Sequence, residues 1–283
     1  YLRREFRFPA ALLIVPAAAV VIWVLNSVRI ASLILIGHHG APGVALGGFH
    51  SQAGWIAFLA VAMGICTLSM RLPGFAAAQR VVAVGGRTDE QVDPAPYLMP
   101  FLAILAASII LGALSSGFDW LYGMKIVACA AACWVYRETY RQIDWRFGGW
   151  SAAGGILVFA IWIAMDRSAV TGMPAELAAA PAAVQAGWIG LRMLGAVITV
   201  PVAEELAFRG YLMRRWTWGP VLVSSVLFGA MHGGRWIEGT IAGLVYAGVM
   251  IRTRRLGEAV AAHAVTNLCL AIWVLTRGQW QLW

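Results

Sequence analysis

This chain contains a series of apolar segments, each about as long as a helix that crosses a membrane, and they limit the folds that it can adopt. A spanning helix needs about 20 apolar residues, and hydrophobic residues make up 61% of the sequence against 12% for charged residues. This composition excludes a water-soluble enzyme, a nucleic-acid-binding protein and a disordered chain, because a soluble core cannot hide so much apolar surface. Backbone groups in lipid must be paired within the protein, which favours helices. We therefore predict an all-α polytopic membrane protein with about nine transmembrane helices. The expected segments lie roughly at 9–36, 50–70, 97–116, 120–136, 150–165, 186–213, 220–232, 237–251 and 257–276.

The distribution of arginine predicts how the chain is oriented. With the amino terminus in the cytoplasm, the cytoplasmic segments hold most of the arginines, and the outer segments hold only Arg167, Arg235 and Arg277. Cytoplasmic loops of membrane proteins carry such an excess of positive charge. The net charge of +8 therefore indicates membrane orientation and not nucleic-acid binding.

A long polar stretch, residues 72–96, separates the first two apolar segments from the rest. It contains Gly85-Gly86 and Pro94-Ala-Pro96, which are typical of loops and linkers. We predict a domain boundary here, with a cytoplasmic linker between an amino-terminal piece at 1–71 and a larger block at 97–283.

Charged residues inside the sixth segment are the first candidates for chemistry, because each costs roughly 2.5–3.5 kcal/mol to place in a membrane. This segment contains Glu204-Glu205-Leu-Ala-Phe-Arg209. Glu205 and Arg209 are four residues apart on one helix face, so we expect them to neutralise each other. Glu204 points about 100° away from Glu205 around the helix axis, so it has no partner on its own helix. Such a carboxylate can serve as a general base. The alternative is that all three residues form an ion cluster at the end of the helix.

Polar residues in two further segments favour the functional interpretation. His232 ends Phe228-Gly-Ala-Met-His232, and the last segment contains His263-Ala-Val-Thr-Asn267. His263 and Asn267 share a helix face and can donate to the oxyanion of a tetrahedral intermediate, while His232 can share the proton of a water held by Glu204. A single buried histidine is more often a packing residue. Two histidines, a glutamate pair and an asparagine within spans are harder to explain as packing, because each of them needs its own buried partner. Zinc is a second alternative, although HExxH is absent and the ligands would come from three helices.

The ordered motifs EExxxR, FxxxH and HxxxN, each on its own apolar segment, resemble the CAAX protease and bacteriocin-processing family of intramembrane glutamic endopeptidases. The resemblance covers about residues 186–276. It implies hydrolysis of peptide bonds within the membrane without a metal or another cofactor. It also implies the roles of the site residues, with water activated by Glu204 and His232, the oxyanion held by His263 and Asn267, and support from Glu205 and Arg209.

A second resemblance lies before the linker. Asn26-Ser-Val-Arg29 in the first segment, followed by Phe49-His50 and Gly54-Trp55, resembles the end of an exosortase, a membrane transpeptidase-like enzyme with a Cys/Arg/His site. Arg29 and His50 match that site, although a snorkelling arginine and a residue at a helix start would explain them equally well. The nucleophilic cysteine of that family precedes the arginine, whereas the first cysteine here is Cys66. The site is thus incomplete, and we expect the chain to be the cut end of a longer protein.

The two resemblances together predict a fusion of an exosortase piece at 1–71 with a CAAX-type protease at 97–283, as in exosortase E. We expect a multi-pass protein of a bacterial inner membrane. Its partners would be the lipid bilayer and a membrane-associated protein or peptide substrate with a carboxy-terminal sorting signal of VPEID type, and no nucleic acid. Three alternatives to a metal-free intramembrane endopeptidase remain: a zinc-dependent membrane protease, a transporter with a proton relay, and a non-catalytic scaffold or immunity protein.

Overall fold

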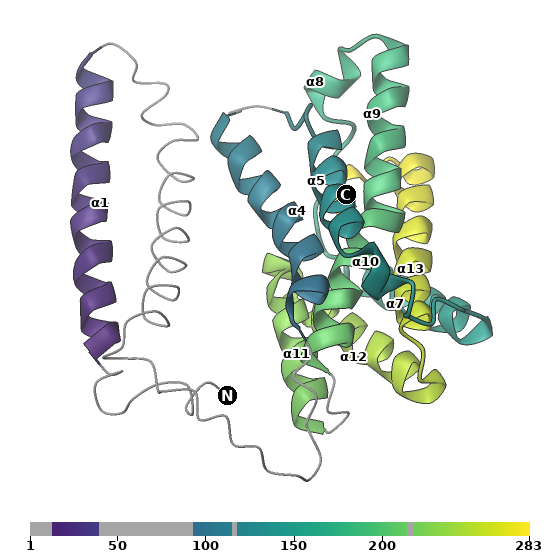
Figure 1. Ribbon diagram of the computed structural model, residues 1–283. Coiled ribbons are helices and arrows are strands. Elements are labelled where there is room, and N and C mark those ends of the chain that lie inside the picture. Colours follow the sequence, from purple (N-terminus) through teal and green to yellow (C-terminus); the bar gives the residue numbers. More distant parts are fainter. Residues whose placement is uncertain (1–12, 40–92, 115–117, 214–217) are drawn as a thin grey trace, which may run out of the picture. The chain divides into compact units, whose positions relative to one another are not determined.

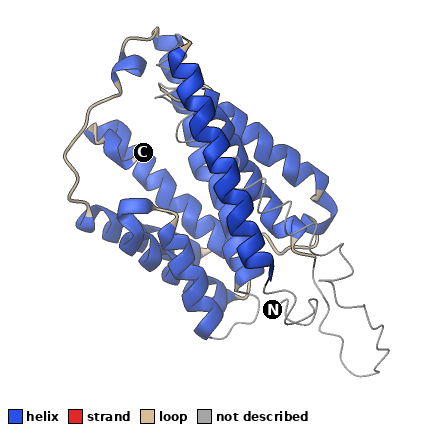
Figure 2. Ribbon diagram, turned by 90° about the vertical axis from the view of Figure 1, so that its left-hand side faces the viewer, coloured by secondary structure: helices blue, strands red, loops and turns tan. Residues whose placement is uncertain are grey.

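The computed structural model describes residues 13–39, 93–114, 118–213 and 218–283. These residues form helices joined by loops and contain no strand (Figure 2), which confirms the all-α prediction. Every apolar segment predicted within these ranges is a helix whose ends lie within a few residues of the prediction. The segment predicted at 50–70 lies outside the described residues, so the count of nine helices stays a prediction.

By its internal contacts the chain divides into two units, Tyr1–Gln91 with Ser108–Gly117 and Val92–Ala107 with Phe118–Trp283. Helix α4 begins at Ala95, inside the last residues of the predicted linker. The rest of that linker lies outside the described residues, and the division into an exosortase piece and a protease block stays a prediction. The helices that follow are labelled in Figure 1. They are α1 (Ile14–His38), α4 (Ala95–Leu114), α5 (Gly123–Val135), α6 (Arg137–Tyr140), α7 (Gly149–Met165), α8 (Ala175–Ala178), α9 (Ala182–Leu194), the π-helix η2 (Gly195–Thr199), α10 (Val200–Glu205), the π-helix η3 (Leu206–Leu212), α11 (Trp218–Ala230), the 3₁₀ turn η4 (Gly233–Arg235), α12 (Trp236–Thr253), α13 (Leu256–Arg277) and the 3₁₀ turn η5 (Trp280–Leu282).

Four helical stretches among the described residues are long and apolar enough to cross a membrane. The stretch from α9 to η3 is continuous, Ala182–Leu212, and carries the EExxxR motif. Helices α5, α7 and α11 are apolar but shorter. Large apolar side chains such as Ile156, Leu222 and Ile272 are exposed on the outside of these helices, as expected where lipid and not water surrounds the protein. The chain is therefore a multi-pass membrane protein. The four stretches that are long and apolar enough to cross a membrane are Pro16–His38, Ala95–Gly112, Ala182–Leu212 and Leu256–Arg277.

Helix α1 shows how a span accommodates polar side chains. Its hydroxyl groups at Ser27 and Ser32 donate to the carbonyl oxygens of Trp23 and Val28, one turn earlier, at 3.0 and 2.9 Å. Such bonds satisfy a hydroxyl without a partner from outside the helix. The helix has apolar side chains on every face, although it also carries Asn26 and Arg29, and this pattern is typical of a span and not of a soluble surface helix.

Glycines allow the helices around the centre of the second unit to approach closely. A Cβ atom on Gly155 of α7 would lie 2.5 Å from the backbone oxygen of Ala262 in α13, and one on Gly243 of α12 would lie 2.9 Å from the Cα atom of Ser225 in α11. Small residues at such contacts are typical of helix packing in membranes. This packing fixes α7, α11, α12 and α13 as a rigid frame around the polar residues described below.

The contact at Gly155 leads to a stability prediction. We expect Gly155→Ala to destabilise the protein by about 1–3 kcal/mol, the usual cost of overpacking, because the added methyl would overlap backbone in α13. The matched control is Gly187→Ala in α9, where no atom lies within 4 Å of the added carbon and alanine favours the helix. Thermal unfolding of both variants in detergent is the measurement. Equal unfolding temperatures for the two variants would contradict the close α7–α13 contact.

Candidate active site

The helix that carries the two glutamates has two π segments, and the first has an identifiable cause. In η2 the N–H of Val200 donates to the oxygen of Gly195, five residues earlier. The next bond of this kind would join residue 201 to the oxygen of Ala196, but residue 201 is a proline and has no N–H to donate. The carbonyl of Ala196 is thus left for another donor, and π segments of this kind recur at functional sites.

Asn267 of α13 supplies that donor. Its side-chain Nδ2 lies 2.7 Å from the oxygen of Ala196, which fixes the amide against the π segment. The amide nitrogen carries two hydrogens, so one N–H remains for another acceptor. The predicted position of Asn267 on one face with His263 agrees with the structure, since both residues line the same cavity.

A cavity of about 210 Å³ lies between η2, α10 and α13. Its walls contain all four residues whose roles in catalysis were predicted from the motifs, and they come from three different stretches of the chain. Those roles themselves stay predictions. The residues that line the cavity are Tyr122, Trp162, Arg192, Ala196, Val200, Glu204, Phe228, His232, Ala242, Tyr246, His263, Thr266, Asn267, Leu270, Leu282 and Trp283.

The length of α11 explains how His232 reaches the cavity. Helix α11 has 13 residues, or about 20 Å, which is shorter than the roughly 30 Å hydrocarbon core of a membrane. His232 follows at its end, and its Nδ1 lies 2.8 Å from the oxygen of Phe228. A carbonyl oxygen only accepts, so Nδ1 carries the hydrogen of this bond. In a neutral ring Nε2 is then the acceptor.

Glu204 is held in this wall without a partner for one of its oxygens. Its Oε2 is buried and has no hydrogen-bond partner among the described residues. Buried polar atoms are paired in most native structures, so an unpaired carboxylate oxygen in a cavity wall is a position where a water or a substrate group would be favoured. This agrees with the expectation that Glu204 has no partner on its own helix.

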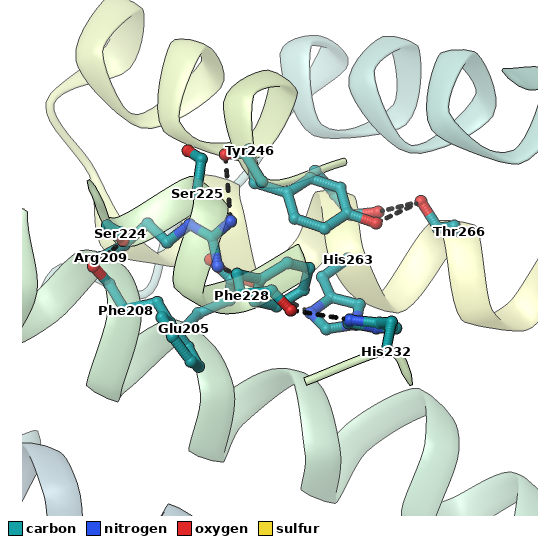
Figure 3. A network of polar contacts seen from close by, with 12 residues as sticks. Glu205, Phe208, Arg209, Ser224, Ser225, Phe228, His232, Tyr246, His263 and Thr266 are labelled. Carbon is teal, nitrogen blue, oxygen red and sulfur yellow. Dashed lines mark hydrogen bonds and ion pairs between the residues drawn. The ribbon is translucent and has the colours of Figure 1, made fainter. Parts of the chain in front are cut away.

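Glu205 and Arg209 form a fully buried ion pair. Arg209 Nη1 lies 3.0 Å from Glu205 Oε1, and both side chains have no exposed surface. A second guanidinium nitrogen donates to the oxygen of Gly243 at 3.0 Å, and the group also lies over the ring of Phe228, 4.3 Å from its centre. Figure 3 shows the arginine within this network. The pairing predicted from the four-residue spacing is thus present.

The same carboxylate also contacts His263, a partner on another helix that the sequence did not predict. Glu204 lines the cavity and Glu205 does not, as expected for adjacent side chains that point about 100° apart on one helix. His263 Nδ1 lies 3.0 Å from Glu205 Oε1, and His263 itself lines the cavity. Glu205 therefore lies directly behind the cavity, and its carboxylate accepts the Nδ1 hydrogen of a histidine in the cavity wall.

Two further residues support His263, and the motifs did not predict either of them. The ring of Tyr246 is stacked on that of His263, with centres 5.0 Å apart. The Tyr246 hydroxyl donates to Thr266 Oγ1 at 2.8 Å, and Thr266 in turn donates to the oxygen of Gly155 at 2.9 Å. Figure 3 shows Tyr246 and Thr266 beside the two histidines. Thr266 lies inside the HxxxN motif, but no sequence signal marks Tyr246 among the other aromatic residues of the spans.

The donor set does not fit a metal site. Among the described residues, no group of three or more His, Cys, Asp or Glu side chains is placed to hold an ion. His263 Nδ1 is bound to Glu205 and His232 Nδ1 to a backbone oxygen, so only Nε2 of each ring remains as a ligand atom. The zinc alternative is therefore not supported by the arrangement of these side chains.

The second predicted site cannot be assembled from the described residues. Arg29 lies in α1, whereas His50 and Cys66 lie outside the described ranges. The exosortase-like pair of Arg29 and His50 stays a prediction.

Comparison with protein families agrees with both motif sets. Residues 185–269 match the family of type II CAAX prenyl endopeptidase Rce1-like proteins. This region contains Glu204, His232 and His263. Residues 1–67 match the transmembrane exosortase family EpsH. No curated protein and no solved structure matches the chain. The chain thus combines an exosortase-like and a CAAX-protease-like region, and the latter supports an intramembrane peptidase.

Proposed function

We propose that the chain is an intramembrane endopeptidase that hydrolyses peptide bonds with a water held between Glu204 and His232. The observation that carries this proposal is that Glu204 and His232 line one cavity, while Glu204 Oε2 is buried without a hydrogen-bond partner among the described residues. A water has two hydrogens, and these two side chains offer two acceptors, a carboxylate oxygen and His232 Nε2. The proposed pairing therefore fits the hydrogen-bond requirement of one water.

In the proposed reaction the oxygen of the water attacks the peptide carbonyl carbon, and Glu204 takes a proton from this water at the same time. The tetrahedral intermediate then carries a negative oxygen. When it collapses, the C–N bond breaks and Glu204 returns the proton to the leaving nitrogen. The water oxygen stays in the new carboxyl group, so that the atoms and charges balance without a cofactor.

The remaining N–H of Asn267 and the Nε2 of His263 are the proposed donors to the negative oxygen. Because His263 donates through Nδ1 to Glu205, its Nε2 can donate only when the ring is doubly protonated. Glu205 would accept the Nδ1 hydrogen of this imidazolium and attract its charge, while also pairing with Arg209. Glu205 is therefore proposed as a positioning residue of the reaction and not only as the partner of Arg209.

The chelator response tests the metal-free mechanism. We expect EDTA or 1,10-phenanthroline to leave cleavage of a randomised peptide pool by the purified chain unchanged, within about twofold, because the side chains of the cavity do not form a metal-binding set. The control is a zinc protease assayed in the same detergent, which should lose its activity. Activity that disappears with chelator and returns with zinc would favour the zinc-dependent protease.

The biological setting follows from the amino-terminal match. The exosortase-like residues 1–67 support a role in a protein sorting and processing system of a bacterial inner membrane. The proposed substrate is a membrane-associated protein or peptide with a carboxy-terminal sorting signal. Detection of such a protein, uncleaved, in cells that carry Glu204→Gln would test this setting.

A further inference from the structure

Arg192 lies on the same helix face as Glu204, three turns earlier. The cavity is lined by residues 192, 196, 200 and 204, which follow one another in steps of four. Three α-helical turns take about 10.8 residues, so residues twelve apart would normally diverge by about 120°. The separation of twelve residues exceeds three α-helical turns by about one residue. The π turn in η2 contains more residues than an α-helical turn, so it compensates for this difference and brings the two residues onto one face. Arg192 and Glu204 therefore lie at two ends of one continuous wall.

Arg192 is held in place by aromatic rings. Its guanidinium carbon lies 4.7 Å from the centre of the Tyr122 ring and 6.0 Å from that of Trp283, and both rings also line the cavity. A guanidinium that stacks on a ring keeps N–H groups at its edge for a planar acceptor. The cation is thus oriented before any ligand arrives.

Arg192 differs from Arg209 and Arg235 in its charge balance. Arg209 is paired with Glu205, and Arg235 with Asp166. Within the described part of the chain, no carboxylate lies within ion-pair distance of Arg192. Arg192 is also the one arginine or lysine among the residues that line the cavity. The cavity therefore offers a fixed positive charge at one end and the proposed hydrolytic pair at the other.

We propose that Arg192 binds a carboxylate of the peptide substrate and so sets the distance between that carboxylate and the cleaved bond. The inference rests on the proposed function of the cavity. Arginine and carboxylate form two parallel charge-assisted hydrogen bonds, and a peptide is the ligand that the other end of the cavity would cleave. Residues 192 and 204 are about 18 Å apart along the helix. An extended peptide covers this distance in about five residues.

Two sources of the carboxylate are possible within one peptide, its free carboxy terminus and an aspartate or glutamate side chain. Three randomised peptide pools separate them. The first pool has free carboxy termini and no acidic side chain, the second has amidated termini and no acidic side chain, and the third has amidated termini and one aspartate. The purified full chain is incubated with each pool in detergent, and the cleavage sites and rates are read by mass spectrometry.

We expect the first or the third pool, or both, to be cleaved with about 10- to 100-fold higher kcat/KM than the second, the range for a hydrogen bond to a charged group. The cleaved bonds should lie about five residues before the carboxylate. Arg192→Gln should remove this preference mainly through KM, whereas Arg192→Lys should retain part of it. The control is Arg277→Gln, because Arg277 also lies over an aromatic ring, that of Trp273 at 5.0 Å, but does not line the cavity.

Equal cleavage of all three pools by the unmodified chain would overturn the inference and leave the proposed function intact. An equal loss of activity of Arg192→Gln on all pools would also overturn it, and would favour a structural or lipid-binding arginine. Failure of the unmodified chain to cleave any pool would instead contradict the proposed function, together with the inference that rests on it.

Discussion

Glu204→Gln is expected to abolish peptide hydrolysis while the protein still folds and inserts. Glutamine has nearly the shape of glutamate but cannot accept the proton of the attacking water, and loss of a general base typically costs about 10²–10⁴-fold in rate. Stability should change little, because Glu204 Oε2 has no hydrogen-bond partner to lose among the described residues. The measurements are kcat/KM on a randomised peptide pool and thermal unfolding in detergent.

Glu238→Gln is the matched control for this prediction. Glu238 lies in the first turn of α12 and does not line the cavity, so the same change of charge there should leave hydrolysis within about twofold. Glu204→Gln with activity close to that of the unmodified chain would show that another group activates the water. If cells that carry Glu204→Gln also behave like cells with the unmodified chain, a non-catalytic scaffold would be favoured.

The second large effect is expected at Glu205, in both stability and activity. Glu205→Gln leaves the charge of Arg209 buried without its counter-ion, and breaking a buried pair from one side costs about 3–5 kcal/mol. The partly exposed pair of Arg235 and Asp166, 3.1 Å apart, serves for comparison. Arg235→Gln should lower the free energy of unfolding by only about 1 kcal/mol. Unfolding temperatures and yields of the two variants are to be compared.

A double variant separates the two roles of Glu205. Glu205→Leu with Arg209→Met removes both charges, and replacement of a whole buried pair by hydrophobic residues of similar volume is often neutral or stabilising, so much of the stability should return. Activity should stay low, because His263 Nδ1 would no longer face a carboxylate. A double variant that regains both stability and activity would contradict the positioning role of Glu205 and leave it a structural residue.

The sequence predicted the elements of this fold better than their contacts. Apolar segments of spanning length became helices wherever the structure describes them, since lipid leaves the backbone no other solution. The pairing of Glu205 with Arg209 was predictable too, because residues four apart on one helix are neighbours. Such local rules carry no information about which helix lies opposite.

The contacts that the sequence did not predict all depend on neighbouring helices or on local irregularity. The bond of Glu205 to His263 joins residues 58 positions apart on two different helices, and the spacing of residues within one helix does not predict it. The π segment at Gly195–Thr199 breaks the regular spacing on which such rules depend, although Pro201 is a visible cause. Neither Arg192 nor Tyr246 belongs to a recognisable motif, so only the cavity reveals their position.

The position of water in an experimental structure of the purified chain would test the proposed pairing of Glu204 with His232. We expect one water within hydrogen-bond distance of both a Glu204 carboxylate oxygen and His232 Nε2, at about 2.6–3.2 Å from each, with no metal ion between them. A separation of these two side chains by more than a helix diameter, about 10–12 Å, or a metal ion bound by them, would contradict this pairing.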